Sequence, residues 1–262
     1  MDLSRYGPWA VVTGASAGLG EEFARRLAAE GFSLVLVARR KDRLEALARE
    51  LSEKHGVEVR PLALDLLREG AVEELDGKTA GLDVGLVVDN AGFGYMGLFL
   101  DQDLARLQEM VRLNCLVVLE VAHRFGRRLR ARGRGGLVVT ASLAGFQACP
   151  YMGAYGATKG FDLLLGESLA HEWKRHGLDV LVLNPGATRT EFGQVAGSTG
   201  GGASMDAGPV VAAALRSLGR KTTLVTGLSN KAAAFLGRLF PRRTVTTLTA
   251  LTLRPMVPPE KR

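Results

Sequence analysis

The chain has 262 residues, a formal net charge of +7 and 47% hydrophobic residues, which is typical of a globular protein with a large core. No apolar run approaches the roughly 20 residues that span a bilayer, and the first residues lack the pattern of a signal peptide. Cys115 and Cys149 have apolar or small neighbours, and the four histidines show no ligand spacing. We therefore expect free buried thiols, no metal site and a cytoplasmic location.

The first element predicted is a buried strand over residues 9–13, an apolar run with β-branched side chains. A glycine-rich turn, residues 14–20, follows it, and residues 21–30 then show the apolar spacing of a helix. Glycine lets the backbone approach a pyrophosphate, and a helix N-terminus offers free N–H groups to it. This order of strand, glycine turn and helix predicts a dinucleotide-binding loop.

The second strand, predicted over residues 32–38, ends in Arg39 and Arg40. A carboxylate at this place would accept the ribose hydroxyls of NAD, whereas guanidinium groups pair with phosphate oxygens. We therefore expect a 2′-phosphate, and hence NADP(H), at this strand end. The alternative is that both arginines are solvent-exposed residues at a helix entry, in which case the cofactor is NAD(H).

A helix over residues 41–56 and a strand over residues 57–64 come next. Asp65 and Leu66 follow that strand at its carboxyl end, where cofactor-lining residues lie in such folds. Asp65 either meets the adenine edge or caps a following helix, and the sequence does not decide between these roles.

The fourth strand, residues 82–88, is followed by Asp89-Asn90-Ala91-Gly92, small and polar residues that permit close approach to a ligand. Residues 102–132 are predicted to be helical, as two joined helices, with Asn114 in an apolar stretch. Because an unsatisfied buried amide is costly, we expect Asn114 to have hydrogen-bond partners.

A fifth strand, residues 136–141, ends at Ser142, thirteen residues before Tyr155. Tyr155 and Lys159 lie four apart in a predicted helical region over residues 151–176, which puts them on one helix face. A nearby ammonium lowers the pKa of a phenol, and such a tyrosine can exchange a proton with an alcohol or carbonyl.

The last third of the chain continues the alternation of strand and helix. A sixth strand over residues 178–183 is broken by Asn184-Pro185-Gly186, and a glycine- and serine-rich stretch, residues 194–207, is typical of a mobile loop. A helix over residues 209–218, a strand over residues 222–226 and a helix over residues 231–240 follow. The tail from residue 241 has no clear pattern; it could cover the sheet, close a pocket or touch a membrane surface.

Strands that alternate with helices predict an α/β fold. We expect one domain over residues 1–262: a doubly wound, mainly parallel sheet of about seven strands flanked by helices in three layers, a Rossmann fold. A substrate loop is expected at about residues 187–208 and a C-terminal extension from about residue 241.

These motifs occur in the order and spacing of the short-chain dehydrogenase/reductase family, which the chain resembles over residues 8 to 190. They are the glycine turn, Asn90-Ala91-Gly92, Asn114, Ser142, Tyr155-Gly156-Ala157-Thr158-Lys159 and Pro185-Gly186.

The resemblance implies a role for each matching residue. Tyr155 would be the general acid/base, Ser142 would polarise the substrate carbonyl, Lys159 would lower the pKa of the tyrosine and bind the nicotinamide ribose, and Asn114 would hold a relay water. Cofactor binding is implied for Gly14, Ser16, Gly18, Leu19 and Gly20 at the pyrophosphate, for Asn90, Ala91 and Gly92 beside it, and for Pro185, Gly186, Thr188 and Thr190 at the nicotinamide end.

Two positions depart from the family pattern. Asp89 stands where the first of two asparagines is usual, and Ala17 stands near the place of a basic residue that NADP-preferring members often carry. The expected NADP(H) preference therefore depends on Arg39 and Arg40. Family members usually pair through the two long helices that carry Asn114 and Tyr155, so a homodimer or homotetramer is expected.

The function that the resemblance implies is interconversion of a ketone and a secondary alcohol with NADP(H). Phe93, Tyr95, Met96, Phe146, Met152 and Phe192 favour an apolar small-molecule substrate, and the region around Tyr155 resembles members that reduce 3-oxoacyl or steroid ketones. Two other classes remain open. One is a non-catalytic NAD(P)-binding redox sensor. The other is a nucleic-acid-binding protein that uses the basic run at residues 124–134, although we expect no specific complex.

Overall fold

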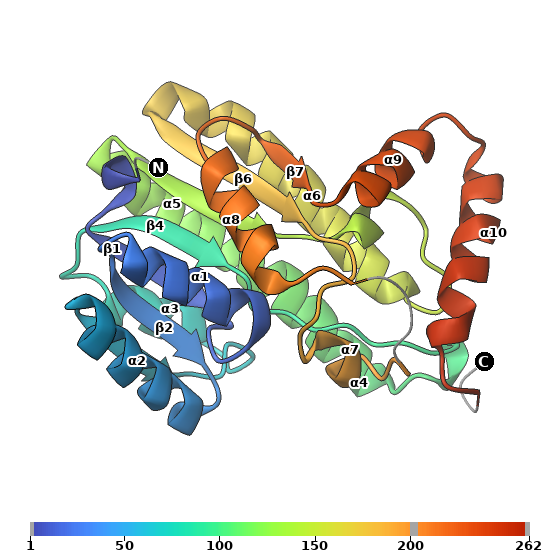
Figure 1. Ribbon diagram of the computed structural model, residues 1–262, viewed down its shortest axis with the longest axis horizontal. Helices are drawn as coiled ribbons and strands as arrows, with labels where there is room; N and C mark the ends of the chain where they lie inside the picture. The colour runs from blue at the N-terminus through green and yellow to red at the C-terminus, as the bar shows by residue number, and fades with distance from the viewer. Residues whose placement is uncertain (1–2, 200–203, 260–262) are drawn as a thin grey trace.

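Seven parallel strands form one sheet in the order β3-β2-β1-β4-β5-β6-β7 in the computed structural model, which describes residues 3–199 and 204–259 (Figure 1). The strands are β1 (Trp9–Thr13), β2 (Ser33–Ala38), β3 (Val59–Ala63), β4 (Val84–Asp89), β5 (Gly135–Thr140), β6 (Leu178–Asn184) and β7 (Thr223–Val225). The predicted parallel sheet is confirmed, with strand boundaries that shift by at most two residues.

The strand sequences are apolar because both faces of the sheet are covered. Every residue of β1 and β4 is buried. A parallel strand covered on both faces reads as a continuous hydrophobic run rather than an alternating one. β3 differs: it is an edge strand with exposed positions, and it carries Pro61, which has no N–H to donate to a neighbour.

Helices cover both faces of the sheet and give three layers. On one face α1, α2 and α8 pack with inward residues such as Val12 and Leu36, and on the other α3, α5 and α6 pack with Val11 and Val37. The helices are α1 (Gly18–Ala29), α2 (Lys41–His55), α3 (Ala71–Lys78), α4 (Leu104–Val111), α5 (Val118–Arg132), α6 (Gly153–Trp173), α7 (Phe192–Val195), α8 (Ala207–Ser217), α9 (Leu228–Leu236) and α10 (Arg242–Leu253).

The strand order reverses between β1 and β4, which opens a crevice at the carboxyl ends of these strands. The glycine turn after β1, the 89–92 segment after β4 and Ser142 after β5 all lie at that edge. Ligands of doubly wound folds bind at such a switch point. The sheet topology therefore brings together motifs that are up to 128 residues apart in the sequence, from Gly14 to Ser142.

The long helical stretch expected over residues 102–132 is continuous but not uniform. A π-helical turn, Arg112–Val117, joins α4 to α5, and Asn114 lies within it. A π-turn inserts an extra residue into a helix, and such turns recur at functional sites.

The C-terminal part holds the largest differences from the sequence expectations. α9 begins at Leu228 and ends at Leu236, not at residues 231 and 240, because Gly237 starts a turn. The tail from Pro241 forms α10, which its many threonines did not predict. Four of these threonines donate their hydroxyls to the carbonyl four residues earlier, a side-chain bond that threonine can make within a helix. No element was predicted over residues 67–81, where α3 lies.

Candidate active site

The glycine turn is tightly packed against the segment that follows β4. Gly14 has φ +67°, and a Cβ built on it would lie 2.9 Å from the Asn90 Nδ2. A Cβ on Gly20 would lie 2.3 Å from the carbonyl oxygen of Gly14. Glycine is required at both positions, because any larger residue would push two backbone segments apart. α1 begins at Gly18 and not at the expected residue 21. Gly18 and Gly20 of the glycine turn therefore belong to the first turn of this helix.

The N-terminus of α1 is free of side-chain caps. Its N-cap residue, Ala17, is extended and offers no capping oxygen. The first N–H groups of the helix therefore face the crevice with the positive end of the helix dipole. A cofactor pyrophosphate would satisfy these N–H groups, so the residues present fit the group that the sequence predicted.

Thr13 ties the glycine turn to the strand end of β4, a role that the sequence did not indicate. Its Oγ1 accepts hydrogen bonds from the backbone N–H groups of Asn90 and Ala91, each at 2.9 Å, and donates to Asp89 Oδ1 at 3.0 Å. The Asn90 Nδ2 in turn donates to the Thr13 carbonyl at 3.2 Å. The 89–92 segment is therefore held in place before any ligand binds.

The two arginines predicted to bind a 2′-phosphate differ in their surroundings. The Arg40 guanidinium donates to Ser16 Oγ at 3.1 Å and forms an ion pair with Glu191 at 2.7 Å, which Arg43 also contacts at 2.6 Å. The Arg39 side chain is exposed and has no ion pair or hydrogen bond among the described residues. Arg40 is thus next to the phosphate loop, while Arg39 is free to turn toward a ligand.

Asp65 and Leu66 follow the carboxyl end of β3, and the two side chains differ in exposure. Asp65 is exposed, and its Oδ1 accepts from the Leu67 N–H at 3.1 Å, which closes a local turn. The alternative role as a helix cap is wrong, because α3 begins only at Ala71 with Gly70 as its N-cap. Leu66 is buried in the sheet core, so only its backbone is available to a ligand.

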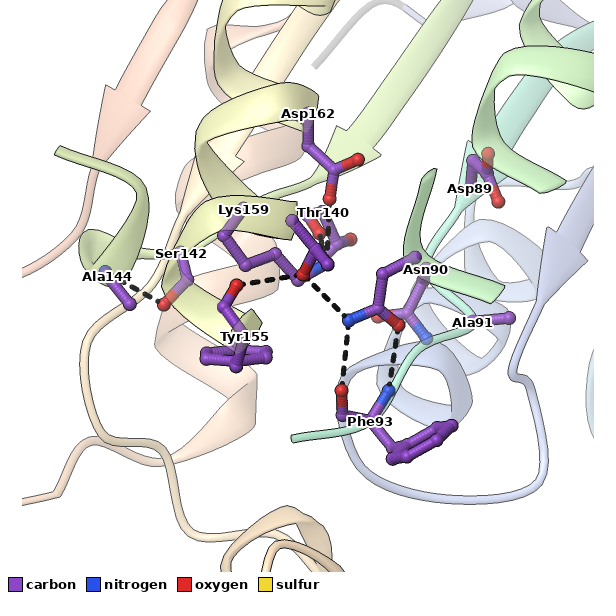
Figure 2. A network of polar contacts seen from close by, with 12 residues as sticks. Asp89, Asn90, Ala91, Phe93, Thr140, Ser142, Ala144, Tyr155, Lys159 and Asp162 are labelled. Carbon is purple, nitrogen blue, oxygen red and sulfur yellow. Dashed lines mark hydrogen bonds and ion pairs between the residues drawn. The ribbon is translucent and has the colours of Figure 1, made fainter. Parts of the chain in front are cut away.

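Ser142 and Tyr155 are brought together at the end of β5. The Ser142 side chain lies near enough to the Tyr155 side chain to lower the pKa of Tyr155, and the Ser142 Oγ accepts from the Ala144 N–H at 3.1 Å. Figure 2 shows both residues beside Lys159. Burial raises the pKa of Tyr155 above its ordinary value, and the charge of Lys159 and the nearby Ser142 hydroxyl oppose that rise.

The ammonium of Lys159 points inward to two acceptors. Its Nζ donates to the Thr140 carbonyl at 2.8 Å and to Asp162 Oδ2 at 2.8 Å (Figure 2). Burial alone would lower the pKa of Lys159, but the negative charges of Asp162, Tyr155 and Asp89 and the hydrogen bond to Asp162 together outweigh this effect and raise it. Asp162 was not among the predicted site residues, although its position three after Lys159 puts it on the same helix face.

Asn114 has the buried partners that its apolar surroundings required. Its Nδ2 donates to the Phe93 carbonyl at 2.9 Å and to Thr158 Oγ1 at 3.1 Å, while its Oδ1 accepts from the Phe93 N–H at 3.2 Å. A Cβ on Gly92 would lie 2.9 Å from that Oδ1 and 3.6 Å from Lys159 Nζ. Asn114 therefore links α6 to the cofactor-side turn, close to Lys159.

Asp89 places a second buried carboxyl group near this network. It is 2% exposed, and its Oδ2 has no hydrogen-bond partner among the described residues. Burial raises the pKa of Asp89 to about 7, although the bond from Thr13 opposes the rise. Near neutral pH this carboxyl group is partly protonated. In its protonated form it is uncharged and can donate a hydrogen bond, as can the asparagine side chain that is usual at this position.

The remaining predicted cofactor residues follow β6. Thr188 Oγ1 donates to the Gly186 carbonyl at 3.1 Å, and a Cβ on Gly18 would lie 3.0 Å from Thr190 Cγ2. The Pro185 carbonyl accepts from the Leu143 N–H at 3.0 Å. This segment therefore bridges the glycine turn and the segment that carries Ser142. The expected substrate loop at residues 187–208 lies partly outside the described residues, at 200–203.

Apolar side chains surround the Tyr155 ring. Phe192 lies 5.4 Å from it between ring centroids, and Phe93, Met96 and Met152 belong to the same cluster. Phe146 packs instead against the cluster of Ala141, Leu163 and Val182. The C-terminal residues Leu253, Met256 and Val257 complete the cluster from the other side.

This site has the parts needed for proton exchange with a carbonyl or alcohol, next to a loop that fits a dinucleotide. Among residues 3–199 and 204–259, no group of three or more His, Cys, Asp and Glu side chains could hold a metal ion. Cys115 and Cys149 are free and buried, as expected.

Comparison with known sequences places this site in context. The family model for short chain dehydrogenase matches residues 8–199. A very-long-chain 3-oxoacyl-CoA reductase of Podospora anserina is 42% identical over 187 residues, which are 68% of this chain and 55% of that protein. A 7beta-hydroxysteroid dehydrogenase of Collinsella aerofaciens is 32% identical over 233 residues, 87% of this chain and 89% of that protein. The chain thus spans little more than half of the fungal relative.

Solved structures agree with these matches. One, described as giving insights into 7beta-hydroxysteroid dehydrogenase stereoselectivity, has a TM-score of 0.86 at 28% identity and covers 94% of this chain and 98% of its own. A short-chain dehydrogenase from Sphingobium yanoikuyae in complex with NADPH has a TM-score of 0.79 at 32% identity and covers 89% of this chain and 94% of its own.

Proposed function

Because the chain belongs to the short-chain dehydrogenase/reductase family and is an oxidoreductase that acts on a ketone or alcohol, we propose that it uses NADP(H) and an apolar substrate. The observation that carries this proposal is the meeting of Ser142, Tyr155 and Lys159 at one sheet edge, beneath an apolar cluster. The substrate class favoured is a bulky ketone, 3-oxoacyl-like or steroid-like, by analogy with the relatives named above.

The preference for NADP(H) is supported by Arg40, Arg43 and Arg39. Three guanidinium groups lie at or next to the end of β2, and Arg40 donates to Ser16 of the glycine turn. Glu191 neutralises part of this charge through its two ion pairs, so NAD(H) remains the alternative cofactor. The NADPH complex of the Sphingobium relative is consistent with the same choice.

In the proposed reaction, the nicotinamide supplies or accepts the hydride when it is bound. Ser142 and Tyr155 donate hydrogen bonds to the substrate oxygen, where negative charge develops during reduction. Tyr155 then delivers its proton to that oxygen. The apolar cluster excludes water from this proton transfer, which strengthens both hydrogen bonds.

Lys159 keeps the tyrosine active in either direction. Its buried ammonium stabilises the phenolate that forms when Tyr155 gives up its proton. Asp162 and the Thr140 carbonyl hold the ammonium in place. Asn114 positions the adjoining turn through Phe93 and is proposed to hold the water through which protons return to Tyr155.

The proposal is tested by incubating the purified protein with NADPH or NADH and a panel of bulky ketones, and following the loss of nicotinamide absorbance. We expect turnover with at least one apolar ketone and a lower KM for NADPH than for NADH. Tyr155→Phe is expected to lower kcat by at least about a hundredfold, because the acid is lost, while NADPH affinity stays within a few-fold. Turnover by Tyr155→Phe close to that of the parent would exclude the acid/base role.

The two other function classes are addressed by the same material. A redox sensor would bind NADPH but turn over no ketone in the panel. A nucleic-acid-binding protein would need the basic run at residues 124–134 to be available, but three of its arginines form ion pairs. These pairs are Arg124 with Glu73, Arg128 with Asp76 and Arg132 with Asp83.

The cytoplasmic location also remains part of the proposal. Its support is the pair of free, buried cysteines, which suits a reducing compartment.

A further inference from the structure

The two last helices carry a group of exposed apolar side chains. We call residues 228–253, which hold α9, the turn after it and α10, the C-terminal hairpin. Figure 1 shows it at the end of the molecule opposite β1 and β2. The exposed large apolar residues on it, with 46% to 84% of their surface accessible, are Leu228, Phe235, Leu236, Leu239, Phe240, Leu248 and Leu251. Large apolar groups gathered in this way mark an interaction surface.

The same region carries only positive charge. Residues 207–259 contain no aspartate or glutamate and eight arginines and lysines. Four of the cations belong to the C-terminal hairpin and are exposed, and none of the four forms an ion pair among the described residues. They are Lys231, Arg238, Arg242 and Arg243. The surface therefore offers unpaired cations beside apolar side chains.

The hairpin is held on the protein body by its other side. Thr249 is buried and accepts a hydrogen bond from the Gln147 side chain at 3.0 Å, and Leu253 packs in the cluster around Tyr155. α10 thus closes the apolar region of the site with one face and presents apolar and basic groups outward with another. The outward residues are not needed for the core, which leaves them for a partner.

The chemistry of this surface selects the kind of partner. An anionic bilayer offers phosphates to the cations at its outer layer and hydrocarbon to the aromatic and leucine side chains beneath. An acidic soluble protein or nucleic acid would match the charges but leave Phe235, Leu239 and Phe240 without an apolar environment. None of the helices in the described part of the chain is both long and apolar enough to cross a bilayer, so the contact would be interfacial.

We propose that the C-terminal hairpin docks on the surface of an anionic lipid bilayer. The side chains at its tip, Phe235 to Phe240, enter the headgroup layer, and Arg242 and Arg243 contact lipid phosphates. This places the apolar cluster of the site, closed by α10, near the bilayer. The inference concerns binding alone and stands whether or not the proposed ketone chemistry is correct.

The test is co-sedimentation of the full-length protein with vesicles of phosphatidylcholine alone or mixed with phosphatidylglycerol. We expect at least about tenfold stronger binding to the anionic vesicles at low salt, weakening as salt is raised. Phe235→Ser with Leu239→Ser should weaken binding to both kinds of vesicle. Arg242→Glu with Arg243→Glu should weaken binding to the anionic vesicles by about tenfold or more, so that the preference over phosphatidylcholine vesicles is lost.

Matched controls lie elsewhere on the surface. Leu100→Ser removes an exposed apolar side chain outside the hairpin, and Arg127→Glu with Arg130→Glu reverses two exposed charges on α5. Both controls should bind vesicles as the parent does. The proposal is overturned if the parent does not sediment with anionic vesicles, or if the hairpin variants bind as well as the controls. It is also overturned if the hairpin variants only convert an oligomer into monomers without changing vesicle binding.

Discussion

Lys159 meets a carboxyl group inside the protein, and this distinguishes its surroundings from those of a lysine that faces only a ligand. Burial raises the pKa of this Asp162 carboxyl group, and the charge of Lys159 opposes the rise. Asp162 is fully buried, and its Oδ1 has no hydrogen-bond partner among the described residues. A buried carboxylate in this state is costly unless the ammonium remains charged. Asp162 therefore acts on the reaction through Lys159, as a positioning residue.

Asp162→Asn keeps an oxygen that can accept from Lys159 but removes the charge. Asp162 raises the pKa values of both Lys159 and Tyr155, so both should fall in the variant. We predict that the acid limb of kcat/KM for alcohol oxidation moves to lower pH, as read from a pH–rate profile. Asp162→Leu should in addition remove the side-chain acceptor that holds the Lys159 ammonium, and with it most of the activity. An unchanged pH profile with only a loss of thermal stability would assign Asp162 a purely structural role.

Asp89 gives a second prediction, about stability. An unfolded aspartate titrates near about pH 3.9, and burial raises the pKa of Asp89 to about 7. Between these values the folded chain holds the extra proton, so this group's contribution to stability is lost as pH rises through that window. Asp89→Asn still accepts from Thr13 and removes the titration. We predict that the variant gains stability over the parent between about pH 4 and pH 7, by roughly 2 to 4 kcal/mol at the upper end.

Urea unfolding at several pH values measures this difference. Asp65→Asn, at an exposed carboxylate outside the buried network, is the control and should give no such trend. A constant difference between Asp89→Asn and the parent from pH 5 to pH 8 would show that Asp89 does not titrate in the expected range.

At the scale of elements, the junction of β1 and α1 depends on backbone contact rather than on side chains. Gly20→Ala would place a methyl group 2.3 Å from the Gly14 carbonyl oxygen, a contact that only a backbone shift can relieve. We predict a loss of about 1 to 3 kcal/mol in stability, seen in denaturant unfolding, and a loss of NADPH affinity of about tenfold or more, seen by fluorescence titration.

Gly77→Ala is the matched control for this prediction. Gly77 lies in α3, is exposed, and has nothing within 4 Å of a built Cβ. Alanine there should stabilise the helix by up to about 1 kcal/mol and leave NADPH binding unchanged. If Gly20→Ala behaves as Gly77→Ala does, the close packing of the glycine turn is not needed for the cofactor.

At the scale of the whole molecule, a second apolar surface supports the expected self-association. Leu116 and Leu119 in the π-turn and α5, and Phe161 and Leu164 in α6, are exposed by 37% to 66%. These are the two long helical segments through which family members were expected to pair. We predict that the protein is a homodimer or homotetramer in solution, as measured by light scattering.

Leu119→Glu combined with Leu164→Glu should convert that oligomer to monomers, because two charges would be buried at the contact. Leu100 is 92% exposed and lies on neither of these helices. Leu100→Glu should therefore leave the molecular mass measured in solution unchanged. A parent protein that is monomeric at micromolar concentration would contradict the prediction.

Much of the fold and most of the site could be predicted from the sequence, because the signals are local. Runs of five to eight residues indicated all seven strands, and the glycines of residues 14–20 indicated the tight turn in which Gly14 and Gly18 have positive φ. The spacing of Tyr155 and Lys159 placed them on one helix face. Asp162 could have been found by the same spacing, and was missed because an acid near a lysine on a helix is usually a solvated pair.

Only the tertiary structure decided the rest, because it depends on contacts between distant residues. Thr13 meets Asn90 and Arg40 meets Glu191 only after the sheet has formed, and no local pattern records either contact. α10 folds from a threonine-rich sequence because its packing through Thr249 and Leu253 outweighs its low helix propensity. The sequence by itself therefore determined most of the elements and the reacting groups, whereas the packing of the chain determined α10, the partners of the reacting groups and their pKa values.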